Sequence, residues 1–90
     1  MKPISLESVC RVVYDRNEAR IRRQKEFKAP ALPYSREDFT KDVLSGGFIL
    51  SPTTVKAKWK ALEATGVVVR GGYSTALNIK ALEQMAEACE

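Results

Sequence analysis

The residues from Ser51 to Gly66 carry both a helix start and a helix stop, and they constrain the fold more than any other stretch of the chain. Ser51 is followed by Pro52. A serine oxygen accepts a hydrogen bond from an unpaired N–H of the first turn, where proline has no N–H to leave unpaired. Gly66 is the matching stop, because glycine adopts the left-handed conformation that ends many helices. The sequence therefore predicts a helix of about four turns over residues 52–65.

The helix predicted over 52–65 has an apolar face and a basic face. The apolar residues recur at i, i+4 and i+7, which places them on one side of a helix; they are Val55, Trp59 and Leu62. The opposite side is slim and basic and carries Thr53, Lys56, Ala57, Lys60 and Ala64, with Thr54 and Lys58 on its flanks and Glu63 to one side. We expect the apolar face to pack in the core and the basic face to look outward.

After Gly66 the sequence changes to the pattern of a β-hairpin. Valines 67–69 and Arg70 favour a strand, and a second strand is expected from Tyr73 to Ile79. Both glycines of Gly71-Gly72 accept positive φ, which suits a two-residue turn. The sequence therefore predicts a short hairpin with this pair at its turn.

The run from Ser51 to Val68, Ser-Pro-Thr-Thr-Val-x-x-x-Trp-x-x-Leu-x-x-x-Gly-Val-Val, resembles the recognition helix and first wing strand of winged helix-turn-helix DNA-binding domains. The likeness covers roughly residues 35–79, about half the chain. It implies a mainly α fold with a small β-hairpin (α+β) in the order α-α-(short β)-α-β-β-α. It also implies that the helix over 52–65 enters the major groove of double-stranded DNA.

A second helix is expected to begin at Ser35, because Asp38 three residues later makes a near capping box. Its inward residues are predicted to be Phe39, Val43 and Leu44, and Ser45-Gly46-Gly47 ends it. The connection to Ser51 exceeds the usual three or four residues of a helix-turn-helix. It contains an apolar trio, residues 48–50, that we expect either to add a short strand beside the hairpin or to plug the core.

The first helix is expected over residues 6–27, with Ser5 as its cap and an apolar stripe of Leu6, Val9, Cys10 and Val13. Asn17 interrupts the stripe before Ile21, and beyond it the helix is charged on all sides. Two interpretations stay open for Arg20, Arg22, Arg23 and Lys25. They are either a solvated helix end, stabilised by pairs such as Glu18 with Arg22 and Arg22 with Glu26, or contacts to phosphates or to the acidic face of a partner.

Ninety residues suffice for a single domain, 1–90. Around the core of 35–79, we expect the basic helix of 6–27, a Pro-rich linker over 28–34 and a C-terminal helix over 80–89. Pro30 and Pro33 stop any helix in the linker, whose Leu32 and Tyr34 should pack on the core.

The last helix has an apolar stripe of Ala81, Leu82, Met85 and Ala86 and an acidic outer face of Glu83, Glu87 and Glu90. We expect this helix to pack either on the body of the same chain or on a second copy of the chain. In the second case the protein is a homodimer through its first and last helices.

The composition argues against catalysis and metal binding. The chain has no histidine, and Cys10 and Cys89 lie far apart with no Cys-x-x-Cys spacing, which disfavours a zinc site and any histidine-dependent nucleophile. Glu37, Asp38 and Asp42 crowd one short helix, but their ordinary role is capping and solvation. We therefore expect no enzyme, no metal and no cofactor. With no long apolar run and no signal-peptide core, a cytoplasmic protein with no membrane contact is expected.

The net charge of +4 has its positive excess in the first two thirds of the chain, which favours a polyanionic partner approached from one side. The expected function is therefore that of a small DNA-binding transcriptional or mobile-element (phage) regulator. Its candidate contacts with nucleic acid are Thr53, Thr54, Lys56, Ala57, Lys58, Lys60, Arg70 and Arg36. The alternative is a winged-helix adaptor or inhibitor that binds a larger protein through its Arg-rich first helix.

Overall fold

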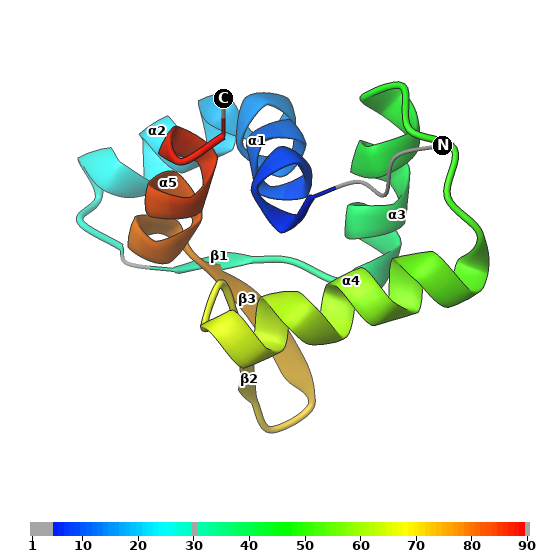
Figure 1. The fold of residues 1–90 in the computed structure, drawn as a ribbon. Coiled ribbons are helices and arrows are strands. Elements are labelled where there is room, and N and C mark those ends of the chain that lie inside the picture. Colours follow the sequence, from blue (N-terminus) through cyan, green and yellow to red (C-terminus); the bar gives the residue numbers. More distant parts are fainter. Residues whose placement is uncertain (1–4, 30, 90) are drawn as a thin grey trace.

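The computed structural model describes residues 5–29 and 31–89, and within them five helices and three strands follow one another along the chain (Figure 1). They are α1 (Leu6–Arg16), α2 (Glu18–Glu26), β1 (Ala31–Pro33), α3 (Arg36–Ser45), α4 (Pro52–Thr65), β2 (Val68–Gly71), β3 (Ser74–Asn78) and α5 (Ile79–Glu87). The strands form one antiparallel sheet in the order β1-β3-β2. The protein is thus a small α+β domain, as the sequence predicts.

Helix α4 begins and ends at the predicted residues. The Ser51 hydroxyl accepts a hydrogen bond of 3.2 Å from the Thr54 N–H, and Pro52 occupies the first turn. Gly66 ends the helix in the left-handed conformation, with φ at 85°. Helix α3 is likewise capped as predicted, because Ser35 and Asp38 form a complete capping box.

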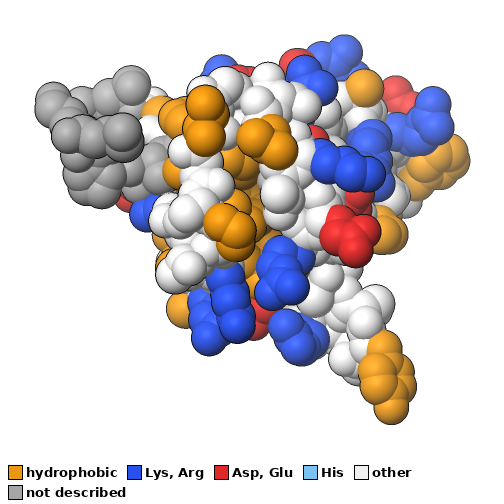
Figure 2. Space-filling model, turned by 90° about the vertical axis from the view of Figure 1, so that its right-hand side faces the viewer, with side chains coloured by type: hydrophobic (Ala, Val, Ile, Leu, Met, Phe, Trp, Pro, Cys, Tyr) orange, Lys and Arg blue, Asp and Glu red, His pale blue; other side chains and the backbone are white. Residues whose placement is uncertain are grey.

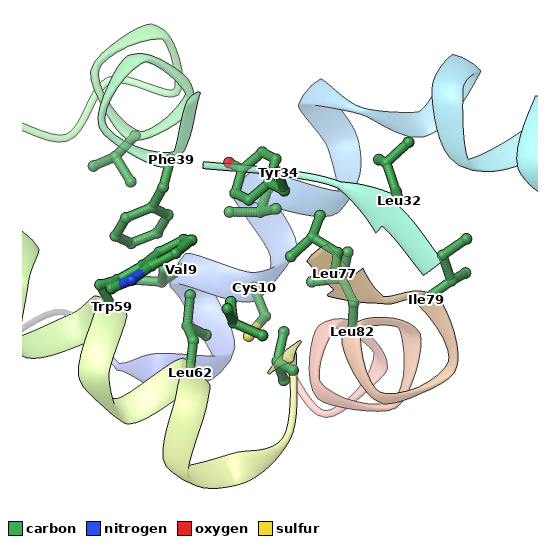
Figure 3. Close-up of a cluster of buried hydrophobic side chains, with 14 of the residues drawn as sticks. Val9, Cys10, Leu32, Tyr34, Phe39, Trp59, Leu62, Leu77, Ile79 and Leu82 are labelled. Atoms are coloured by element: carbon green, nitrogen blue, oxygen red, sulfur yellow. The ribbon is translucent and has the colours of Figure 1, made fainter. Parts of the chain in front are cut away.

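The core forms where these elements converge (Figure 3). The predicted apolar face of α4 is buried, and Trp59 is only 5% exposed. Its ring packs near two other aromatic rings, with centroid distances of 5.6 Å to Phe39 and 6.2 Å to Tyr34. Leu32 and Tyr34 pack on this core, as predicted for the Pro-rich segment. The α4 helix is therefore held to the body by its indole side.

The long first helix predicted over 6–27 is wrong, because the chain breaks at Asn17 into α1 and α2. The Asn17 side chain is buried and donates hydrogen bonds of 2.8 Å to the Val13 carbonyl and 2.8 Å to Asp42 Oδ2. The Tyr34 hydroxyl donates to the same Asp42 oxygen at 2.5 Å. Burial, with the Asp42 hydrogen bond as the next cause, raises the pKa of Tyr34. Asp42 therefore joins three elements instead of merely facing solvent, as the sequence had led us to expect.

The third strand of the sheet does not come from the predicted place. Residues 48–50 form no strand; Phe48 and Leu50 are half-buried against the core, while Ile49 is 92% exposed. The added strand is β1, inside the segment predicted to be a linker. Among the described residues it pairs only with β3, and an edge strand tolerates Pro33 because the missing N–H is not needed there. Pro30 lies outside the described residues.

The hairpin turn is shifted by one residue from the prediction. Gly71 pairs with Ser74, so the two turn residues are Gly72 and Tyr73 instead of Gly71 and Gly72. Only the first of them has positive φ, 63° at Gly72, which matches a turn with glycine at its first central position. The shift places an aromatic side chain at the tip of the hairpin.

The exposed side of α3 differs from the prediction at one residue. Leu44 was predicted to face inward but is 58% exposed, because it lies on the solvent side of α3 next to the buried Val43.

In α5, Leu82 and Ala86 are buried, and α5 packs against α1 within one chain (Figure 1). The predicted stripe is thus covered, and a homodimer through these helices stays a prediction that would need other residues. Glu90 lies outside the described residues.

Cys10 is fully buried on α1, as predicted for a core residue. Burial, aided by the nearby Glu7 carboxylate, raises the pKa of its thiol to about 12. The thiolate is the reactive form of cysteine, so Cys10 serves the core and not chemistry. Among the described residues, no helix combines the length and the apolar character needed to cross a bilayer.

Candidate nucleic-acid interface

The outer face of α4 is open to solvent along its length. Thr53, Lys56, Ala57, Lys60 and Ala64 are all exposed. Within the described part of the chain, none of the lysines of this helix takes part in a salt bridge. Figure 2 shows positive side chains gathered on the lower part of one face, beside the projecting hairpin. The ammonium groups are therefore available to an external anion.

A cleft of about 720 Å³ lies between the start of α3, helix α4 and the β2–β3 hairpin. Its walls bring together four cations from three separate parts of the sequence: Arg36, Lys56 with Lys60, and Arg70. All four belong to the residues that the sequence singled out. Because they come from three different elements, the fold converts scattered positive charge into one concave surface.

Two carboxylates also line the cleft, Glu37 and Glu63. Arg70 Nη2 lies 3.0 Å from Glu63 Oε1, which braces the hairpin against α4. The Arg70 side chain is 63% exposed, and exposed ion pairs contribute only about 0–1 kcal/mol. The pair therefore positions Arg70 without removing it from reach of a phosphate.

The remaining predicted contacts are arranged less uniformly. Thr54 lies at the helix start, where its hydroxyl is 2.9 Å from that of Ser51, so it belongs to the cap. Lys58 is half-buried on the flank of α4 and does not line the cleft. Thr53 and Ala57 are exposed on the same helix face as Lys56 and Lys60.

The Arg-rich helix α2 lies beside α5 and not beside α4. Three of its four candidate side chains have partners within the chain. Arg20 donates to Asn17 Oδ1 and the Pro33 carbonyl; Arg22 pairs with Glu18 at 2.8 Å, as predicted; and Lys25 pairs with Glu83 of α5. The hydrogen bond to Glu83 raises the pKa of Lys25. Among the described residues, Arg23 alone of the four has no such contact, and the expected pair of Arg22 with Glu26 is absent.

The sequence names Tyr73 beside Arg70 as a residue that the hairpin can offer, but not as part of a cleft. Tyr73 lines it from the hairpin tip and is fully exposed. The signal was the Gly-Tyr pair, because a turn placed at Gly72-Tyr73 needs positive φ only at the glycine. The cleft thus combines cations with an aromatic ring.

Nothing in the described residues suggests a metal centre, since no three His, Cys, Asp or Glu side chains gather there in a metal-binding arrangement. Comparisons of the chain with protein-family models, with curated proteins and with solved structures find no match. Function is therefore inferred from the geometry and charge of the cleft.

Proposed function

We propose that the protein binds double-stranded DNA with the outer face of α4 in the major groove. The observation that carries this proposal is the cleft in which Arg36, Lys56, Lys60 and Arg70 meet beside an exposed helix face. A fold that gathers like charges from three elements does so at an electrostatic cost, which a bound polyanion offsets.

The dimensions and side chains of α4 suit this role. The major groove of B-DNA admits one α-helix, and a helix of 14 residues is about 21 Å long. Ala57 and Ala64 keep the exposed face slim, which permits close approach to base edges. Lys56 and Lys60 contact phosphates, and Thr53 at the helix start reaches bases or phosphates. With no arginine on α4, base readout by one copy is limited.

The layout supports a winged helix-turn-helix interpretation of the domain. Helix α3 precedes α4, the β2–β3 hairpin follows it as a wing, and Arg36 and Arg70 line one cleft beside the helix. In this proposal α4 is the recognition helix and the wing contributes Arg70 to the backbone. The biological role is then that of a transcriptional or mobile-element regulator.

Fluorescence anisotropy with a labelled duplex tests the proposal. For four phosphate contacts, we expect the logarithm of the association constant to fall with the logarithm of salt concentration with a slope of about −3 to −4. An RNA duplex of the same sequence should bind more weakly, because the major groove of A-form RNA is too narrow for a helix. Absence of binding at low salt, or a slope near zero, would refute the proposal.

A further inference from the structure

Tyr73 is the most exposed large hydrophobic residue among the described residues, at 111% of the reference area. A tyrosine normally buries about 150–250 Å² of surface in a folded protein. The Tyr73 ring instead stands at the tip of the hairpin, and Figure 2 shows that the hairpin projects well beyond the body with a hydrophobic side chain at its end. This position contributes nothing to the core, so the ring is free for a ligand.

The tip that carries the ring is held in place. The Ser74 hydroxyl donates a hydrogen bond of 3.1 Å to the Gly71 carbonyl across the turn. One residue pair before the turn, Arg70 is tied to Glu63 of α4. Strand β3 is anchored on its other edge, because the Thr75 hydroxyl donates to the Tyr34 carbonyl at 2.5 Å. A ligand therefore meets a hairpin tip whose backbone is positioned relative to α4 before binding.

The ring and the cations line one cleft, since Tyr73 shares it with Lys56, Lys60 and Arg70. Basic side chains follow a nucleic-acid backbone, and an aromatic ring beside them offers a stacking surface for a base. In an intact duplex every base face is already stacked on its neighbours. The side chains that force such steps apart are typically Phe, Leu, Ile, Met and Pro, whereas tyrosine is typical of stacking on unpaired bases.

We propose that Tyr73 stacks on an unpaired base next to the duplex held by α4, so that the ligand is duplex DNA with a single-stranded flank. This inference rests on the proposed function, because α4 must hold the duplex for the ring to meet its flank. The phosphate contacts of Lys56 and Lys60 are the same for blunt and flanked DNA. The Tyr73 ring therefore accounts for the difference in affinity between the blunt and the flanked duplex.

Anisotropy titration of the full chain against three probes tests this inference: a blunt duplex, the same duplex with a single-stranded flank of about six nucleotides, and the flank strand alone. We expect the flanked duplex to bind about tenfold more tightly than the blunt duplex, since stacking of one base on an aromatic ring has an effect of this size. Tyr73→Ala should abolish the preference for the flanked duplex, and Tyr73→Phe should keep it. With 2-aminopurine as the first unpaired base, fluorescence should change with the wild type and Tyr73→Phe but not with Tyr73→Ala.

Each other outcome has one meaning. Equal binding of blunt and flanked duplexes by the wild type overturns the stacking role and leaves duplex binding by α4 intact. A loss on Tyr73→Ala that is equal for blunt and flanked probes also overturns it, since the ring then acts on the intact duplex. Binding to none of the probes refutes the proposed function itself. Tyr73 makes no core contact, so its variants should fold like the wild type, which circular dichroism checks.

Discussion

Replacing Lys56 and Lys60 together with glutamate is expected to weaken duplex DNA binding at least about 100-fold at moderate salt, because two phosphate contacts are lost and two repulsions replace them. Both side chains are exposed on α4 and line the cleft. The slope of the salt dependence should also become shallower by about two, one for each lost contact. Anisotropy titration at several salt concentrations measures both quantities.

The matched control reverses the same number of charges elsewhere. Arg22→Glu with Arg23→Glu changes two exposed arginines on α2, which lies away from the cleft. We expect this variant to bind the blunt duplex within about fivefold of the wild type, the residual loss reflecting net charge alone. Equal losses in the two double variants would contradict a specific role for α4. A larger loss of DNA affinity in the α2 variant would place the DNA interface on the Arg-rich helix. The competing prediction for that helix is a protein partner.

Asn17→Ala is expected to lower the free energy of unfolding by about 2–3 kcal/mol, because it removes hydrogen bonds from a buried site and takes a partner from the Asp42 carboxylate. The Asn17 side chain is 4% exposed and donates to both Val13 and Asp42. Since small domains are stable by only about 5–15 kcal/mol, the change should be evident as a lower urea midpoint at unchanged m-value.

Tyr34→Phe provides the companion measurement, because it deletes only the hydroxyl that donates to the same Asp42 oxygen. The two substitutions share a partner, so their effects should be non-additive by about 0.5 kcal/mol or more in a double-mutant cycle. Arg23→Ala on exposed α2 serves as a neutral reference, with an expected change within about 0.5 kcal/mol. An Asn17→Ala effect as small as this reference would show that the network does not hold α1, α2 and α3 together.

The sequence was sufficient to predict the parts of the fold that depend on local chemistry. The caps at Ser35 and Ser51, the stop at Gly66 and the buried face containing Trp59 all follow from side chains within a turn or two of where they act. The basic face of α4 follows from helical periodicity in the same way. Local signals therefore placed both the helix and the surface that it presents.

The features that local patterns missed depend on partners distant in the sequence. The break at Asn17 is satisfied by Asp42, 25 residues further on, and no period within α1 or α2 contains that information. Likewise, β1 forms because Leu32 lies opposite Leu77 in the sheet, although the prolines of this segment of the sequence favour a linker. The convergence of Arg36 with Arg70 in one cleft was not derivable for the same reason. Each residue was predicted singly, and only tertiary packing made them neighbours.

The most direct test of the DNA-binding face is an NMR titration of the isotope-labelled protein with a blunt DNA duplex, followed through its backbone amides. We expect the largest shift changes along α4 and near Arg36 and Arg70, with small changes in α2 and α5. No change at any DNA concentration, or changes confined to α2, would contradict the proposal that the exposed face of α4 meets the duplex.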